Sequence, residues 1–381
     1  ARLMVETAIL NRFCASLCDA MHRRDTGADA GGPDFEESNH DGIDGQTFIA
    51  HLMTNNLFLI PLDAENRWFR YHHLFQNLLV DQLKQRRSGK DISDYHRRAS
   101  AWFAENGAIN ESFRHALAAG DMPRAIHLIE QHRQAMLNRD RWHVFEKWLT
   151  MLPEIEIEQR PELMMARVWI CYFESKNTAI PPILAAAEAL LSDTPEDRTL
   201  HGEIYLFKAV FSFWQGDISR SFKYIEDALE RIPETQPMVR GFAEIYFGLA
   251  GHTNGQTETV LPVMSDLLSH SSMKSPRKLR IMVALVWMHL LSADLVAASI
   301  RNRQLTDAAI KNNSAAFTSW GAYNQGIIHF YRNELDSAIH YLKQAAETGY
   351  LILKRANVDC LAGLALAYQA TLQTDRADQT I

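Results

Sequence analysis

Apolar and polar positions follow one pattern that returns every 39 residues between Leu200 and Gly349. In each repeat an aromatic-rich helical run breaks at a tight turn, and an amphipathic helix follows it. One such pair cannot bury its apolar face alone, so this period predicts an α-solenoid of stacked helical pairs. The breaks fall at residues that tolerate the backbone angles of a turn: Gly216, Gly255, Asp294 and Asn333, with Asn177 and Asn138 at the same step upstream.

Mostly small side chains recur at two positions of the repeat, where paired helices must approach closely. The spacings resemble the tetratricopeptide pattern, lengthened by longer helices. The match is poorest around Asp294, because Trp287 and Arg303 occupy positions that are usually small or apolar. Seven residues before the turns stand Ala209, Gly248, Trp287 and Gly326, and five residues after them stand Ser221, Val260, Ser299 and Ala338.

The N-terminal part of the chain has a different pattern, which is the outline of a winged-helix domain: helix, helix, hairpin and helix. Residues 23–45 are polar and acidic with almost no apolar side chains, and they predict a mobile loop. The predicted elements are helices at 3–21, 46–55 and 73 to about 86, and a β-hairpin of strands 56–62 and 67–71 around a turn at 63–66.

Lys84–Lys90 is a basic, polar stretch that predicts the end of this domain. A solvated linker and a weak nucleic-acid patch both fit its charge, and the lack of interleaved aromatic residues favours the linker. Shorter helical pairs follow, with helices at 95–106, 109–119, 123–137, 142–149 and 161–174. We therefore expect a mainly α-helical protein with a winged-helix domain at 1–90, a helical arm and the start of the solenoid at 91–160, and a tetratricopeptide-like superhelical sensor domain at 161–381.

Composition narrows the function classes. The net charge of −7 and pI near 6.2 do not suit a surface that grips nucleic acid by neutralising phosphates. Four scattered cysteines do not form a disulfide framework and favour a reducing, cytoplasmic location. Polar residues interrupt the apolar start of the chain, so no secretory signal is expected. Residues 281–291 are too short an apolar run to cross a bilayer, and no membrane partner is expected.

Several segments together resemble the MalT-like, LuxR-type transcription activators of the STAND class of signal-transducing ATPases. The resemblance is specific over roughly residues 1–125 and architectural beyond them. It rests on Glu6–Leu10, Leu17–Ala20, Asn56–Leu62, Trp68–Phe75, His96–Ala99, Trp102–Phe103, Asn106–Gly107 and Ala116–Asp121. It implies a nucleotide-binding domain before the winged helix and a DNA-binding helix-turn-helix after the superhelix, so the chain is expected to be a piece of a longer protein.

The resemblance implies ATP or ADP as the cofactor of the full-length protein and none in this piece. The sequence contains no Gly-x-x-x-x-Gly-Lys-Ser/Thr loop, since Gly89-Lys90 has Lys84 where the first glycine should stand. No nucleophile, base and orienting group can be assembled from the spacings either. We expect no catalytic residues here and no independent enzyme activity.

His72 is the strongest single candidate for a functional residue, and Arg70 lies two positions before it. The segment Arg70–Leu74 resembles the Met-His-Asp motif of related STAND proteins, in which a winged-helix histidine touches the phosphates of bound ADP. A histidine suits this role because its ring donates to a phosphate oxygen. The alternative is that His72 packs the hairpin against the next helix, and His73 replaces the acidic residue of the motif.

Cys14, Cys18 and His22 fall on one face of the predicted first helix, as metal ligands would. A fourth ligand is not evident and the same face continues an apolar stripe, so packing is favoured and no metal site is predicted.

A binding groove in the solenoid is the better candidate site. In tetratricopeptide-like arrays the first helix of each pair lines the groove, and aromatic walls with a few polar groups suit a sugar, an aromatic acid or a peptide. The alternative is that most of these rings form the core between repeats. The candidates are Glu203, Phe213, Trp214, His252, Trp320, Tyr323, Phe330 and Tyr331.

Two functions remain open. In the first, the solenoid senses a small inducer or a regulatory protein, and it controls an ATP-dependent transcription regulator through the winged helix and the nucleotide-binding domain. In the second, the chain is a tetratricopeptide-type scaffold for protein partners, without a transcriptional role. The sequence of the complete gene distinguishes them.

Overall fold

The computed structural model describes residues 2–22, 44–139, 141–269, 275–348 and 354–380. The chain divides into two compact units, residues 1–131 and 132–381. The expected mainly α-helical fold, with a winged helix followed by a tetratricopeptide-like solenoid, is confirmed. The predicted loop at 23–45 lies outside the described residues, apart from its last two positions. Within the described ranges no helix is both long and apolar enough to span a membrane.

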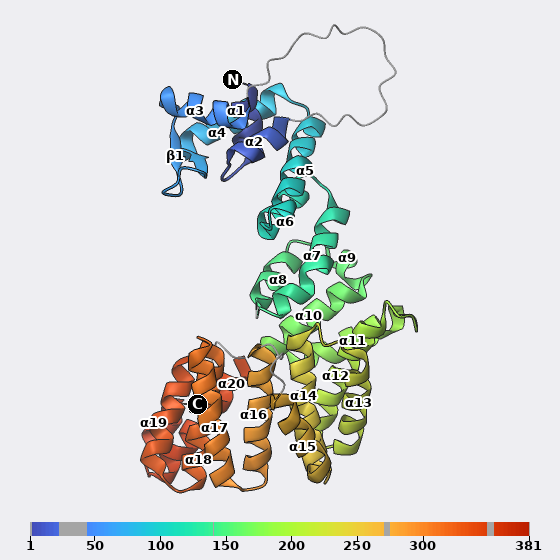
Figure 1. The fold of residues 1–381 in the computed structure, drawn as a ribbon, viewed down its shortest axis with the longest axis vertical. Coiled ribbons are helices and arrows are strands. Elements are labelled where there is room, and N and C mark those ends of the chain that lie inside the picture. Colours follow the sequence, from blue (N-terminus) through green and yellow to red (C-terminus); the bar gives the residue numbers. More distant parts are fainter. Residues whose placement is uncertain (1, 23–43, 140, 270–274, 349–353, 381) are drawn as a thin grey trace. The chain divides into compact units, whose positions relative to one another are not determined.

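The first unit begins with the helices and the two-stranded sheet of the winged helix, drawn in blue in Figure 1. Its division from the second unit falls inside α7, so α5 and α6 of the predicted arm belong to the first unit. The elements are α1 (Arg2–Glu6), a 3-10 turn η1 (Thr7–Ile9), α2 (Ala15–His22), α3 (Gly45–Thr54), β1 (Leu59–Pro61), β2 (Phe69–Tyr71), α4 (His73–Arg86), α5 (Gly89–Glu105), α6 (Ile109–Ala118) and α7 (Met122–Leu137).

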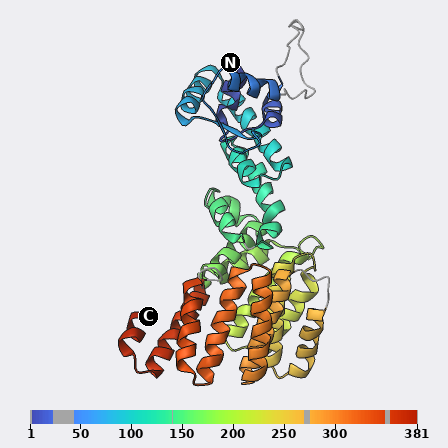
Figure 2. The same cartoon turned by 60° about the vertical axis from the view of Figure 1, so that its left-hand side comes forward.

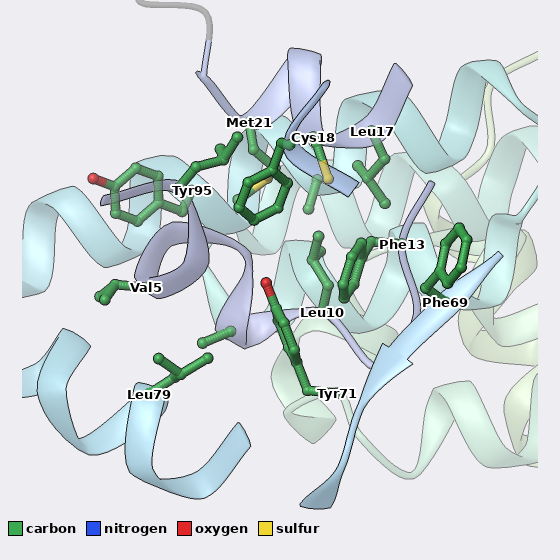
Figure 3. Packing of buried hydrophobic residues seen from close by; sticks show 14 of the residues in the cluster. Val5, Leu10, Phe13, Leu17, Cys18, Met21, Phe69, Tyr71, Leu79 and Tyr95 are labelled. Atoms are coloured by element: carbon green, nitrogen blue, oxygen red, sulfur yellow. The ribbon is translucent and has the colours of Figure 1, made fainter. Parts of the chain in front are cut away.

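The prediction of one helix over residues 3–21 is wrong, because the chain leaves the helical path after Ile9. Phe13 instead forms an extended bridge with Phe69: each backbone N–H donates to the other residue's carbonyl, at 2.8 and 2.9 Å. The Phe13 ring packs 4.7 Å from that of Tyr71. Figure 3 shows these rings with Leu17 and Cys18 in one apolar core. Apolar side chains of this stretch, among them Leu10, Phe13 and Leu17, are therefore buried, although the backbone between them is not one continuous helix.

The β-hairpin lies where the sequence places it. Strands β1 and β2 are antiparallel, with Leu59 opposite Tyr71 and Ile60 opposite Arg70. The Asp63 carboxylate accepts hydrogen bonds from the backbone N–H groups of Arg67 (2.7 Å) and Trp68, which closes the turn. This turn chemistry sets the register of the hairpin and so aims the residues that follow β2.

The junction between α4 and α5 is shorter than the predicted linker Lys84–Lys90. Helix α4 continues to Arg86, and Ser88 caps α5 in a capping box with Asp91. Only Arg87 and Ser88 remain between the two helices, because the cap starts the next helix at once.

The second unit is a row of antiparallel helical pairs, whose members from α12 to α19 lie side by side in Figures 1 and 2. Its elements after α7 are α8 (Trp142–Leu149), α9 (Glu154–Glu158), α10 (Pro161–Phe173), a 3-10 turn η2 (Asn177–Ala179), α11 (Ile180–Leu190), α12 (Arg198–Trp214), α13 (Ile218–Arg231), α14 (Pro237–Thr253), α15 (Thr257–Ser269), α16 (Ser275–Leu291), α17 (Leu295–Lys311), α18 (Ala315–Tyr331), α19 (Leu335–Thr348), α20 (Lys354–Ala370) and α21 (Thr374–Thr380).

The turns within the pairs share one geometry. A residue with positive φ ends the first helix, and the next residue's N–H donates to the carbonyl five positions back, as Asp217 does to Ser212 at 2.9 Å. Among the predicted turn markers, Gly216, Gly255 and Asn333 are confirmed at this position. The full set of positive-φ residues at these turns is Ser175, Gly216, Gly255, Ala293, Asn333 and Leu372.

The turn predicted at Asp294 is one residue too late. Ala293 has the positive φ of 57°, while Asp294 caps α17 by accepting from the N–H of Ala297 at 2.9 Å. The step from Gly255 to Ala293 is therefore one residue shorter than the 39-residue repeat, which explains the poor match at this position. Shifted by one, the expected small or buried positions are filled by Val286, Ala298 and Asn302, all of which are buried.

The two turns predicted upstream, at Asn177 and Asn138, also miss the left-handed turn position. Asn177 begins η2, and the positive φ belongs to Ser175. Asn138 directly follows α7, and its side-chain oxygen accepts from the N–H of Met238 at 3.2 Å. Both lie at helix ends, but neither has the left-handed turn of the regular repeats.

Candidate functional site

His72 stands at the N-cap of α4, directly after β2. Its backbone N–H donates to the carbonyl of Phe58 at 2.8 Å, and its own carbonyl accepts from the N–H of Gln76 at 2.9 Å. These bonds hold the backbone, while the half-buried imidazole ring lies 4.4 Å from that of His73 and makes no capping hydrogen bond. The predicted partner Arg70 projects from β2 into solvent. The backbone of His72 is therefore fixed, and the side chains of His72 and Arg70 remain available to an anion.

Exposed apolar side chains come from the segments next to His72. Phe58 is 61% exposed and Leu74 is 66% exposed, and Leu78 lies one turn further along α4 and is also exposed. Together with Arg70 and His72 they form what we call the wing surface. Large apolar side chains that gather on an exposed surface mark contact sites for other proteins or domains. The wing surface therefore has the composition of a contact site for another domain.

Phe213 and Trp214 end α12 and join an aromatic surface that continues onto α14. Trp214 is 56% exposed, yet its indole Nε1 donates to the hydroxyl of Tyr246 at 3.0 Å. Phe213 packs edge-on against both rings, at 5.5 and 5.7 Å. The hydroxyl of Tyr172 on α10 lies 3.5 Å from that of Tyr246. These four side chains form what we call the aromatic surface.

The sequence prediction missed Tyr172 and Tyr246, although both lie on first helices of their pairs. The criterion that selected Phe213 therefore applied to them as well. Phe242 packs against the aromatic surface, with ring centroids 5.4 Å from Tyr172 and 6.5 Å from Tyr246. Aromatic rings with hydroxyl and indole groups at their edges combine apolar contact with directional hydrogen bonding.

Glu203 does not line a groove, contrary to the expectation. Its carboxylate is completely buried in α12 and accepts from both guanidinium nitrogens of Arg133, at 2.8 and 2.7 Å. Trp169 Nε1 and Gln134 Nε2 also donate to it, at 2.7 and 2.9 Å. Burial disfavours the charged Arg133, but the paired Glu203 outweighs it and raises the pKa of the guanidinium. Glu203 is therefore an interior ion-pair residue that joins α7, α10 and α12.

Trp320 and Tyr323 belong to a separate ring cluster with Trp287. Trp287 and Tyr323 are stacked with centroids 6.1 Å apart, and Trp320 meets them edge-on at 6.4 and 5.9 Å. Tyr323 is only 9% exposed. These rings pack against apolar cores formed by α16–α20, as the alternative interpretation of core packing expects.

The remaining candidates, Phe330, Tyr331 and His252, have different surroundings. Phe330 is partly buried against the core of the last repeats, whereas its neighbour Tyr331 is 64% exposed. His252 bridges the turn after α14: its Nδ1 lies 2.8 Å from the Thr257 hydroxyl and its Nε2 lies 3.2 Å from that of Ser292. Burial lowers the pKa of this imidazole. A contact of these residues with a ligand stays a prediction.

The cysteines and His22 do not converge. Cys18 is fully buried in the winged-helix core, where burial raises the pKa of its thiol, and Cys14 precedes α2. His22 Nδ1 lies 3.7 Å from the carboxylate of Glu6 instead. Among the described residues no group of three or more His, Cys, Asp or Glu side chains is placed to hold a metal ion.

Comparisons with known proteins agree with the winged helix and with the solenoid described above. Residues 1–91 match the MalT winged helix domain. The serine/threonine-protein kinase PknK of Mycobacterium tuberculosis is 27% identical over 277 residues, which are 72% of this chain and 23% of the kinase. The HTH-type transcriptional regulator MalT of Klebsiella pneumoniae is 28% identical over 220 residues, 58% of this chain and 24% of the regulator. The chain thus spans about a quarter of the length of these relatives.

A solved structure shows the same fold. It is the STAND protein with a tetratricopeptide repeat sensor from Pyrococcus horikoshii, with a TM-score of 0.57 and 10% sequence identity, covering 99% of this chain and 55% of that one. Residues 1–91 therefore match the MalT winged helix domain, 58% of the chain is similar in sequence to the regulator MalT, and the chain shares its fold with a STAND protein that has a tetratricopeptide repeat sensor.

Proposed function

We propose that the chain is the winged-helix and sensor portion of a signal-responsive, ATP-dependent transcription regulator. The solenoid binds a small inducer or a regulatory partner, and the wing surface transmits the bound state to a nucleotide-binding domain. DNA is contacted only by a further helix-turn-helix domain. The chain itself senses and transmits, and hydrolysis belongs to the nucleotide-binding domain.

The aromatic surface carries the sensing half of this proposal. Trp214 is more than half exposed and yet held in one orientation by Tyr246 and Phe213. A large ring that is both exposed and fixed loses little conformational entropy when a ligand covers it. The indole N–H already donates to Tyr246, so the exposed ring of Trp214 offers a ligand mainly apolar and stacking contact. Such contact suits a sugar, an aromatic acid or a peptide side chain.

Activation follows from differential binding. An inducer shifts the regulator toward its active form only as far as it binds that form more tightly. Because the aromatic surface draws on α10, α12 and α14, a small change in the stacking of these helices changes the spacing of its rings. A ligand that requires one spacing therefore selects one form of the solenoid.

Calorimetric titration of the chain with panels of oligosaccharides, aromatic acids and short peptides tests the sensing role. Trp214→Ala should weaken the binding of the true inducer at least roughly tenfold, since a buried aromatic anchor contributes more than 1.4 kcal/mol. Leu366→Ala is the matched control, because Leu366 is 55% exposed against 56% for Trp214 but lies on α20, outside the aromatic surface. Binding that is unaffected by Trp214→Ala would place the sensor site elsewhere.

His72 carries the transmitting half. Backbone hydrogen bonds fix its position at the start of α4, and its half-buried ring contacts that of His73 and makes no capping hydrogen bond. In the full-length protein, His72→Ala should speed the release of ADP and raise basal activation, whereas His73→Ala should change both less. Stopped-flow measurement with a fluorescent ADP analogue gives the rates, and equal rates for all three proteins would leave His72 a packing residue.

A scaffold role is the second candidate. Exposed apolar side chains on α17, Val296, Ile300 and Ile310, favour a protein partner. The complete coding sequence separates the two functions, since a phosphate-binding loop upstream and a helix-turn-helix downstream are required by the regulator alone.

A further inference from the structure

Helix α12 carries a pocket of about 290 Å³ on a face distinct from the aromatic surface. Its floor consists of Lys208, Phe211, Ser212 and Gln215, which share one side of the helix because they are spaced by three or four residues. Trp214, by contrast, is directed toward Tyr246 on α14. The pocket therefore has its own set of residues, and its occupation does not depend on the aromatic surface.

Two neighbouring helices form the walls. Helix α11 contributes Leu184 and Glu188, and α13 contributes Arg220 and Tyr224. The volume lies at the lower end of the range of small-molecule sites, roughly 300–1,000 Å³. With the Phe211 ring on its floor, the centre of the pocket suits a small apolar or planar group.

A partly exposed ion pair lines one end of the pocket. The ammonium of Lys208 contacts both carboxylate oxygens of Glu188, at 2.6 and 2.7 Å. It also lies 5.9 Å from the centre of the Tyr224 ring. Because the two charges neutralise each other, this end offers a ligand polar contacts but no net charge.

At the opposite end of the pocket lie Arg220 and Gln215, whose side chains carry hydrogen-bond donors. Arg220 is mostly exposed and pairs with Asp217, Nε to Oδ2 at 3.2 Å. A guanidinium has five N–H donors, so this pairing leaves donors for a second anion. The side-chain amide of Gln215 has no hydrogen-bond partner within the described part of the chain. Asp217 already caps this end of α13 by accepting from the Arg220 backbone N–H at 3.2 Å, so a ligand would meet the Arg220 side chain and not the helix end.

We propose that this pocket binds a small carboxylic acid with a planar apolar body. The carboxylate lies between Arg220 and Gln215, and the body covers Phe211 and Leu184. A carboxylate matches the two-donor fork of an arginine better than a hydroxyl or an amide does. The site gives the solenoid a second ligand input, separate from the one proposed at the aromatic surface.

The probe is 3-phenylpropionate, titrated calorimetrically into the whole chain. Its uncharged counterpart 3-phenylpropanamide should bind roughly tenfold more weakly or worse, since a hydrogen bond to a charged group contributes about 1.5–3 kcal/mol. Arg220→Gln should reduce the affinity for the acid to that for the amide. Arg303→Gln is the matched control, because Arg303 is an exposed arginine on α17, remote in sequence from the pocket.

A variant that fills the pocket tests the proposed binding site without changing any charge. Ala185 lines the pocket and is exposed, so Ala185→Trp fills the space without disturbing the interior, and it should abolish binding of the acid. Trp214→Ala should leave this binding unchanged, which separates the pocket from the aromatic surface. The proposal would be overturned if the unaltered chain did not bind the acid. It would also be overturned if the Arg220→Gln and Ala185→Trp variants bound the acid as tightly as the unaltered chain does.

Discussion

The hydroxyl of Tyr95 on α5 donates a hydrogen bond of 3.0 Å to the buried carboxylate of Glu6 on α1. Arg2 donates to the same oxygen at 2.7 Å, and Arg87, between α4 and α5, lies 3.5 Å from it. One carboxylate therefore joins the start of the chain to the end of the winged helix and the beginning of the arm. A buried charge with several donors is stable only while they remain in place.

Tyr95→Phe should destabilise the first unit by about 1–3 kcal/mol, because it removes one hydrogen bond to a charged group while leaving the ring in place. Differential scanning calorimetry of the chain should show a lower midpoint for the corresponding transition. Tyr331→Phe, at an exposed tyrosine of the second unit, serves as the control and should shift neither transition.

Glu203→Ala should destabilise the second unit by about 3–5 kcal/mol, since Arg133 would be left buried without its partner. The double variant Glu203→Leu with Arg133→Met should lose less, because it removes both charges. Glu154→Ala breaks the more exposed pair with Arg167 and should change stability by about 1 kcal/mol or less. Urea unfolding of the three proteins measures these differences. A double variant as unstable as Glu203→Ala would contradict the expected origin of the loss.

The paired imidazoles of His96 and His115 predict a loss of stability in acid. Their Nδ1 atoms lie 2.8 Å apart, so one neutral ring donates and the other accepts. Burial, and then the charge of His96, lowers the pKa of His115 from 6.5 to about 4. A group whose pKa is lower in the folded state stabilises the fold above its unfolded pKa and loses that contribution as the pH falls.

The first unit should therefore weaken between pH 6.5 and about pH 4. Melting temperatures measured across this range give the slope. His115→Gln should flatten the slope, because a glutamine does not titrate. An unchanged slope in that variant would assign the acid sensitivity to other groups.

Local patterns predicted most of the architecture. The hairpin depends on Asp63 and the turn next to it, and the regular turns depend on residues such as Gly216 that accept a positive φ. Such features are determined by neighbours in the sequence, so a single sequence suffices to place them. The same applies to the position of His72 directly after β2.

Interactions between distant segments were not predictable in this way. Phe13 leaves the helical path because it pairs with Phe69, and Glu203 is buried because Arg133 lies opposite it. Neither partner can be identified from spacing alone. For the candidate site, the sequence selected aromatic residues on the first helices, but it could not separate the exposed Trp214 from the packed Tyr323.

Ala293 is the clearest local deviation from the repeat, because it adopts a φ of 57° where Gly216 and Gly255 stand in other repeats. An alanine in the left-handed region costs roughly 1–2 kcal/mol, which glycine avoids. Ala293→Gly should therefore stabilise the second unit by about 1 kcal/mol, a value reduced by the greater freedom of glycine in the unfolded chain. Gly216→Ala is the reciprocal change and should destabilise by a similar amount. Thermal unfolding of both variants decides the point, and a destabilising Ala293→Gly would show that the side chain of Ala293 contributes more than its backbone strain costs.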